Sequence, residues 1–366
     1  VKAQSDDAAR NELNPQETGG SLATRFDEQD MLRVIVQLKV GQAAKSAELM
    51  TPSIHQVQRD VLGEVKGGQV RVIHEYDYIP FMALEVDRAA FEALQKNPNV
   101  LGIAEDIIMK PMLTQSVPLI GADDVWVEGV TGAGQVVAIL DTGVDKNHPA
   151  LAGKVVEEAC YSSNTTSTSS LCPGGVTETT AVNSGMPCNI IGCEHGTHVA
   201  GIVAADGFDN VTPIKGVAPD AQIIAIQVFS KVSSSSIGSW STDQIKGLER
   251  VYALKDTYNI ASVNLSLGSN NVYSTVCDNL SGNQAYKQAV NNLRAVGIAT
   301  IAASGNNGTS TGISSPACIS SVVSVGATTK LDLVASYSNS ASFLDLLAPG
   351  TSINSSIPGT EYKEDS

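Results

Sequence analysis

The chain has 366 residues, of which 42% are hydrophobic, and it carries a formal net charge of −15 at pH 7. This length allows two or three domains with at least one large core, and the hydrophobic fraction excludes a disordered or fibrous chain. The negative charge argues against nucleic acid as a partner, because phosphates would repel it. A membrane-spanning segment is also excluded, since no apolar run is long enough to cross a bilayer.

The first third of the chain predicts a polar leader followed by a small module. Residues 1–30 are rich in Asp, Glu, Asn and Gln and are expected to form a flexible leader. The next residues predict strands at 32–40, 69–73, 81–86 and near 100–108, with helices near 54–65 and at 88–96, the second capped by Asp87. The order β-α-β-β-α-β is the split βαβ, ferredoxin-like arrangement. We assign this α+β module to residues 31–113.

Residues 114–366 alternate strands and helices. The pattern predicts strands at 135–141, 222–228, 260–267, 298–303, 321–325 and 343–347, and helices near 196–205, 242–257 and 282–296. Such an alternation predicts an α/β fold with a doubly wound, mostly parallel sheet. Residues 157–193 are rich in Ser, Thr, Gly and Cys and are predicted to form a surface loop held by disulfides.

The six cysteines form an even set, which suits disulfides in a secreted protein. We favour the pairs Cys160–Cys172, Cys188–Cys193 and Cys277–Cys318, and free buried thiols in a cytosolic protein are the alternative. The cysteines at 188 and 193 do not form a C-x-x-C pair, which disfavours a zinc ribbon. The start at Val1 rather than Met suits a trimmed, secreted chain.

One motif centred on an aspartate and one centred on a histidine occur at positions where α/β sheets commonly have their active sites. Asp141 ends a continuous apolar strand and is followed by the turn Thr142-Gly143. Open α/β sheets bind ligands at the carboxyl ends of their strands. His195 stands at the start of a helix of small residues that also contains His198. A turn-forming aspartate and a structural pair of histidines are the plainer alternatives.

A third motif, Ser304-Gly305-Asn306, directly follows another apolar strand. Glycine lets the backbone approach a ligand closely, and the asparagine amide can donate a hydrogen bond to an oxyanion. The alternative is a simple turn, since Gly-Asn-Asn-Gly is also a turn sequence.

With Asp, His and Asn in this order, the sequence resembles the subtilisin family of serine peptidases over almost its whole length. Asp141-Thr-Gly-Val-Asp145 resembles the family's aspartate motif, and His195-Gly-Thr-His-Val-Ala-Gly201 resembles its histidine motif. The resemblance implies that Asp141 orients His195, that His195 is the general base, and that Asn306 is the oxyanion donor. It also implies that His198 is structural. The implied substrate-binding residues are Ser266, Leu267, Gly268, Ser304 and Gly305.

The resemblance also implies what the enzyme binds. Its substrates would be proteins or peptides, and catalysis would need no cofactor and no metal. Calcium is a candidate structural ion, although Ala150 replaces the aspartate of the family's His-Pro-Asp-Leu segment. The family's open apolar pocket and Leu113 at the expected cleavage point favour large apolar residues before the scissile bond.

Residues 31–113 resemble the subtilisin prodomain, which assists folding and then inhibits the enzyme. The resemblance implies maturation by cleavage between Leu113 and Thr114. The family's nucleophile motif, Gly-Thr-Ser-Met-Ala, is expected after Ser366, so residues 1–366 hold two members of the triad and are expected to be inactive alone. We reject Ser352 as the nucleophile, because Ile353-Asn354 follows it in place of Met-Ala.

Two other functions are kept as alternatives. One is a catalytically inactive relative that binds peptides in the same cleft. The other is a metal-dependent hydrolase that uses His195 and His198, although the sequence lacks the glutamate of an H-E-x-x-H site.

Overall fold

The computed structural model describes residues 22, 24–27, 29–40, 47–106, 108–111, 118–209 and 212–365. They form two compact units. The first unit extends to Glu105 and includes Asn279–Gln284, and the second contains the residues from Asp106 to Asp278 and those from Ala285 onward. The predicted cleavage bond Leu113–Thr114 and most of the predicted leader lie outside the described residues.

The first unit is one antiparallel sheet with two helices. Its elements are β1 (Leu32–Leu38), α2 (Ala47–Glu64), β2 (Val70–Glu75), β3 (Phe81–Val86), α3 (Arg88–Lys96) and β4 (Val100–Glu105). The strand order is β2-β3-β1-β4, and every neighbouring pair is antiparallel. This is the predicted split βαβ topology.

Apolar residues on both helices cover this sheet. In α3 the buried residues are Ala90, Phe91 and Leu94, a helical spacing that faces β3 and β4. Asp87 caps α3 as predicted, because its Oδ1 accepts a hydrogen bond of 2.8 Å from the Ala90 N–H. The core also includes Leu22, with Phe26 packed against it, so part of the predicted leader belongs to the first unit.

The predicted strand near 100–108 is two strands that belong to different units. β4 ends at Glu105, and β5 (Ile108–Pro111) pairs with strands of the second unit. Between them, the buried Asp106 carboxylate accepts hydrogen bonds from the Ser241 hydroxyl (2.6 Å) and the Thr242 N–H (3.1 Å). These bonds satisfy donors at the start of a helix and hold Asp106 to the second unit.

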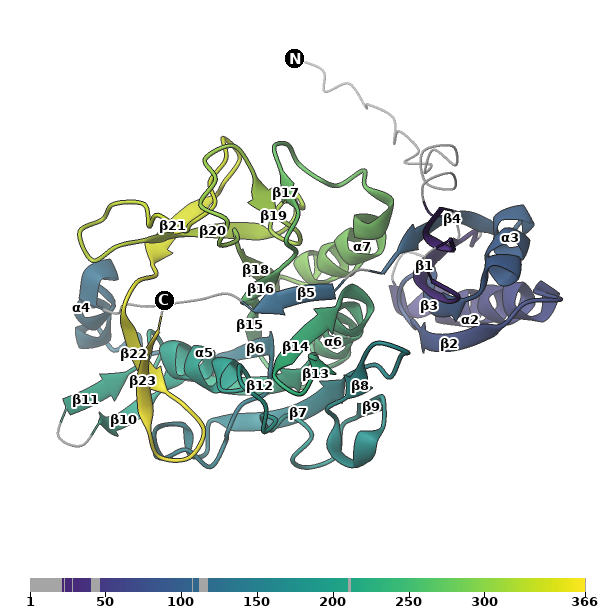
Figure 1. Ribbon diagram of the computed structural model, residues 1–366. Coiled ribbons are helices and arrows are strands. Elements are labelled where there is room, and N and C mark those ends of the chain that lie inside the picture. Colours follow the sequence, from purple (N-terminus) through teal and green to yellow (C-terminus); the bar gives the residue numbers. More distant parts are fainter. Residues whose placement is uncertain are drawn as a thin grey trace, which may run out of the picture. The chain divides into compact units, whose positions relative to one another are not determined.

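The second unit is built on an eight-stranded sheet (Figure 1). In spatial order its strands are β21 (Leu346–Pro349), β20 (Val323–Thr328), β18 (Ala299–Ala303), β15 (Ile260–Leu265), β6 (Val136–Asp141), β12 (Gln222–Gln227), β7 (Val155–Tyr161) and β9 (Glu178–Thr179). All neighbours are parallel except β7 and β9. The predicted mostly parallel sheet is confirmed.

Helices pack on both faces of this sheet. On one face, α5 (His195–Ala204) shares a buried cluster with Ile139 and Ala225. On the other, Gly247 of α6 (Ser241–Ala253) lies so close to Leu140 that an added Cβ would be 2.7 Å from its side chain. Successive residues of β6 therefore face different helices, which explains its continuous apolar sequence and confirms the doubly wound α/β fold.

The prediction of a surface loop over residues 157–193 is wrong at its start. The strand β7 extends to Tyr161 and is hydrogen-bonded to β12, with Ala159 and Cys160 fully buried. Thr, Ser and Gly dominate only the part that follows, where short elements occur at β8 (Ser169–Ser170), η3 (Pro173–Gly175) and β9. The three favoured disulfides, Cys160–Cys172, Cys188–Cys193 and Cys277–Cys318, are all formed.

The remaining helices and strands lie outside the two main sheets. They are η1 (Pro118–Ile120), α4 (Ala122–Val127), η2 (Pro149–Leu151), β10 (Asp206–Asp209), β11 (Thr212–Lys215), β13 (Ser230–Ser233), β14 (Ser236–Trp240), β16 (Leu267–Gly268), β17 (Val272–Tyr273), α7 (Ser281–Ala295), β19 (Ile313–Ser314), β22 (Ile353–Ser356) and β23 (Tyr362–Asp365). Within the described part of the chain, every helix is too short or too polar to cross a membrane.

Candidate active site

Asp141 and His195 form a hydrogen-bonded pair. The ring Nδ1 of His195 lies 2.7 Å from Oδ1 of Asp141. The Asp141 side chain is fully buried, whereas that of His195 is 18% exposed. A carboxylate can only accept at neutral pH, so Nδ1 carries the proton and Nε2 is left as the basic nitrogen. This is the tautomer that a general base requires.

Tight backbone packing brings the two residues together. Asp141 ends β6, and Gly143 then adopts φ +100°, a conformation that side chains rarely allow. Gly196, the second residue of α5, lies against this turn, where an added Cβ would be 2.3 Å from the Gly143 carbonyl oxygen. The two glycines therefore let the start of α5 reach the carboxyl end of β6.

The segment Ser304-Gly305-Asn306 follows β18 at the same edge of the sheet. Since β6, β15 and β18 are neighbouring parallel strands, their carboxyl ends meet there. Gly305 has φ +110°, and an added Cβ would be 2.3 Å from Nδ2 of Asn339. The sequence thus places Asn306 at the edge where Asp141 also lies.

Asn339 holds this segment in place, a role that sequence reasoning missed. Its backbone carbonyl accepts a hydrogen bond of 2.8 Å from the Ser304 hydroxyl, and its Oδ1 accepts one of 2.9 Å from the Asn307 N–H. Asn339 is fully buried. Nothing in its sequence context, Ser-Asn-Ser, distinguishes it from a surface turn, so only the tertiary structure could reveal it.

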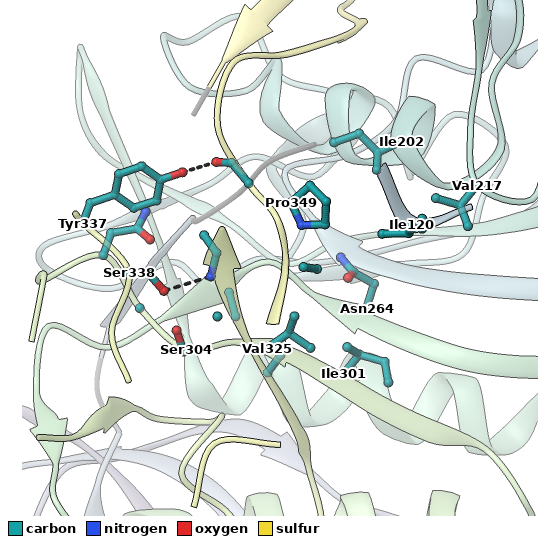
Figure 2. Close-up of a pocket in the computed structure, with 18 residues that line it drawn as sticks. Ile120, Ile202, Val217, Asn264, Ile301, Ser304, Val325, Tyr337, Ser338 and Pro349 are labelled. Atoms are coloured by element: carbon teal, nitrogen blue, oxygen red, sulfur yellow. Dashed lines mark hydrogen bonds between the residues drawn. The ribbon is translucent and has the colours of Figure 1, made fainter. Parts of the chain in front are cut away.

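A cavity of about 230 Å³ opens beside these residues. Ser304, Gly305 and Asn306 line it together with mostly apolar side chains. Figure 2 shows Ile120, Ile202 and Val217 on one side of the cavity and Ile301 and Val325 on the other. The Tyr337 hydroxyl donates a hydrogen bond to the Gly350 carbonyl at its rim. The cavity can accept an apolar segment next to the polar groups.

Of the predicted substrate-binding residues, Ser304 and Gly305 follow β18, Ser266 lies between β15 and β16, and the other two lie in a strand with an extended partner. Leu267 and Gly268 form β16, which pairs antiparallel with β5. The other edge of β5 pairs with β14, where Ser239 and Trp240 stand opposite Met109 and Ile108. β5 therefore lies between two strands, as Figure 1 shows. Sequence reasoning missed β14, because its Ser- and Gly-rich sequence has no strand-like periodicity.

His198 does not share the environment of His195. It is buried, and its Nε2 donates to the carbonyl oxygens of Ile353 (3.1 Å) and Lys363 (3.0 Å) in the hairpin β22–β23. Burial lowers the pKa of His198 and keeps its ring neutral. Its Nε2 is thus directed at backbone carbonyls rather than at a shared metal position.

No group of three or more His, Cys, Asp or Glu side chains is arranged to hold a metal ion anywhere in the described ranges. The donor set available to the metal-dependent alternative is therefore His195, already bonded to Asp141, and His198, bonded to two carbonyls. Two histidines in different hydrogen-bonding roles make a poor zinc site.

The sequence is similar to known proteases over most of its length. A family profile described as the Subtilase family matches residues 132–365. The chain is 32% identical over 323 residues to an alkaline protease of Alkalihalobacillus alcalophilus, covering 86% of this chain and 73% of that protein. It is 33% identical over 312 residues to Subtilisin E of Bacillus subtilis (strain 168), covering 83% and 70%. The M-protease of Shouchella clausii (strain KSM-K16) is 33% identical over 306 residues, covering 82% and 68%.

The matched residues 132–365 include β6 with Asp141, α5 with His195, and the segment after β18 that contains Asn306. The chain therefore belongs to the subtilase family of serine peptidases.

Proposed function

We propose that this chain is part of a secreted serine endopeptidase precursor in which Asp141, His195 and Asn306 carry out catalysis with a serine nucleophile. The hydrogen bond of 2.7 Å between His195 and Asp141 carries the proposal. With its proton fixed on Nδ1, His195 can accept the serine hydroxyl proton at Nε2 as the serine oxygen adds to the peptide carbonyl. It then returns that proton to the leaving amine.

Asn306 is proposed as the donor that stabilises the oxyanion of this addition. Its position directly after β18, on a segment fixed by Asn339, supports the role, because a preorganised donor loses little energy to reorganisation. Subtilases need no cofactor for catalysis. Calcium is kept only as a candidate structural ion, and Ala150, at the position of the family's aspartate, is fully buried and offers no oxygen side chain.

The nucleophile is proposed to lie in sequence that follows Ser366. The cavity beside Asn306 supports this, because it is mostly apolar and lies where β18 ends at the carboxyl edge of the sheet. An apolar segment packed there would cover Ile301 and Val325.

The first unit is proposed to be a prodomain that acts as an intramolecular inhibitor. Support comes from β5, which joins the two units in sequence and lies between β14 and β16 in the manner of an extended peptide. Proteins and peptides that bind as a strand between the same two elements are the proposed substrates. Cleavage of a peptide library by the mature enzyme would test the proposed preference for large apolar residues.

The decisive experiment is labelling of the full-length protein with a fluorophosphonate probe, which reacts with an activated serine. We expect labelling, and its loss in an His195→Ala variant. Peptide binding without labelling would indicate the inactive relative instead. Activity that a chelator abolishes, with no labelling, would indicate the metal-dependent hydrolase.

A further inference from the structure

The segment Gly185–Cys193, which ends in the Cys188–Cys193 disulfide, is packed against the turn that follows Asp141. The Val144 N–H donates to the Gly185 carbonyl (2.7 Å), and the Thr142 hydroxyl donates to the Cys193 carbonyl (3.0 Å). Gly143 lies between these two bonds, where an added Cβ would be 2.5 Å from the Met186 carbonyl oxygen. The predicted surface loop therefore ends in a segment that contacts the active-site turn.

Thr142 connects this segment to both members of the pair. Its N–H donates to Oδ1 of Asp141 (2.7 Å), the same oxygen that accepts from His195. Its hydroxyl oxygen accepts a hydrogen bond from the Gly196 N–H (2.8 Å), while the hydroxyl group donates one to the Cys193 carbonyl oxygen. Thr142 is fully buried, so no water competes for these bonds. The Cys193 carbonyl thus fixes the direction of a hydroxyl that joins the Asp141 turn to the first turn of α5.

The Cys188–Cys193 disulfide closes the short loop that ends at the Cys193 carbonyl. Residues 185–193 contain no helix or strand, only turns, bends and irregular backbone. The Cα atoms of Cys188 and Cys193 are 5.4 Å apart, and the crosslink closes this short loop directly before Glu194 and His195. Inside the loop, the Cys193 N–H donates to the Ile190 carbonyl (2.9 Å). A crosslink removes most conformations that such an irregular loop could otherwise adopt.

We propose that the Cys188–Cys193 disulfide loop is a positioning element for the Asp141–His195 pair, with Cys193 and Thr142 as its positioning residues. This inference rests on the proposed catalytic role of that pair. Without the crosslink, the Cys193 carbonyl leaves its position, and the Thr142 hydroxyl loses its acceptor. The first turn of α5 then moves relative to Asp141, and His195 spends less time in the productive orientation.

The first test compares two disulfide-free variants of the full-length protein. In Cys188→Ser/Cys193→Ser we expect kcat to fall by about 10- to 100-fold with little change in KM, because misplacement of catalytic groups affects turnover more than binding. The matched control is Cys160→Ser/Cys172→Ser. That disulfide starts two strands away from β6 in the sheet, and its loss should leave kcat near that of the parent.

A second readout does not depend on turnover. The Nδ1 proton of His195 is followed by NMR, together with the pH titration of the ring. In the Cys188→Ser/Cys193→Ser variant we expect the hydrogen-bonded Nδ1 signal to broaden or vanish and the titration to shift, whereas the control keeps both. If the parent protein never hydrolyses peptides, the proposed function fails, but this measurement still decides whether the loop positions His195.

A third pair of variants leaves the disulfide intact and serves if its removal prevents folding. Thr142→Val keeps the shape of the side chain but removes the hydroxyl, and should reproduce the changes in kcat and in the Nδ1 signal. Thr142→Ser keeps the hydroxyl and should restore both. Unchanged kcat, Nδ1 signal and titration in Thr142→Val, or in the disulfide-free variant, would overturn the inference.

Discussion

The carboxylate of Asp141 accepts hydrogen bonds from the His195 ring and the Thr142 N–H through the same oxygen, Oδ1. Both donors come from segments that are themselves held by close backbone contacts. A buried acceptor with two short bonds cannot rotate freely, so the ring orientation of His195 follows from that of Asp141. At the residue scale, the site is therefore an oriented pair rather than two nearby side chains.

Replacing Asp141 with asparagine should preserve the shape of the side chain but alter the tautomer of His195. The asparagine amide can donate to Nδ1, which moves the ring proton to Nε2 and removes the base. We expect kcat to fall by about 10⁴-fold, as for the aspartate of serine-protease triads generally. Steady-state kinetics of the full-length protein measure kcat. A kcat within a few-fold of the parent would contradict the proposed role of Asp141 in orienting His195.

Two buried histidines predict a loss of stability in acid. Burial lowers the pKa of His148 and of His198, although Asp145 beside His148 and Asp365 near His198 act in the opposite direction. His148 Nδ1 also accepts from the Ala150 N–H, and a proton there would break that bond. The unfolded chain binds these protons more readily, so the stabilisation is complete above the ordinary histidine pKa of about 6.5 and declines as pH falls below it.

Urea unfolding between pH 8 and pH 4.5 measures this loss. A His198→Leu variant should be less stable at neutral pH by about 1–3 kcal/mol, because the Ile353 and Lys363 carbonyls lose their shared donor. It should also lose stability less steeply in acid than the parent does. If the free energy of unfolding fell equally steeply with pH in both proteins, His198 would not be a source of the acid sensitivity.

At the scale of elements, glycines decide how closely the active-site segments approach one another. Gly143 has a positive φ, and an added Cβ would be 2.5 Å from the Met186 carbonyl oxygen, whereas Gly134 has a similar φ and nothing within 4 Å. Gly134→Ala should therefore cost only backbone strain, about 1 kcal/mol. Gly143→Ala adds a backbone clash and should cost several kcal/mol more. Chemical denaturation of the two variants measures the difference, and equal losses would contradict this account.

In the first unit, Asp87 stabilises two elements at once. One carboxylate oxygen caps α3 at the Ala90 N–H, and the other accepts from the Gln69 N–H (2.9 Å). We expect Asp87→Ala to lower the free energy of unfolding of this unit by about 1–2 kcal/mol. The control is Glu92→Ala on the exposed face of α3, where only a few tenths of a kcal/mol should be lost. A smaller effect at Asp87 than at Glu92 would show that the cap does not stabilise the unit.

At the scale of the whole molecule, the two units are joined in sequence by β5, whose backbone bonds belong to the second unit. If the first unit is a prodomain, incubation of the full-length protein should produce one new amino terminus at Thr114, or a residue to either side. An Asp141→Asn variant should retain the uncut chain. Amino-terminal sequencing measures this, and a single new terminus elsewhere would contradict the proposed maturation.

The sequence by itself determined the class of fold, and its motifs predicted which residues would form the candidate site. Periodicity predicted the split βαβ module and the parallel sheet, because burial on one face or on two leaves different apolar patterns. The positions of the six cysteines along the chain suggested the three disulfides that are formed. The hydrogen bond between Asp141 and His195 agrees with the motifs that suggested it.

Only the tertiary structure decided what supports those motifs. Asn339, the strand β14 and the bond from Thr142 to Cys193 gave no local signal, since each depends on residues brought together from distant parts of the sequence. The strand β7 was likewise hidden inside a loop-like composition until its pairing with β12 was known. A sequence pattern predicts which residues of a segment are buried. Which distant residue each of them contacts depends on how the sheet and its loops pack.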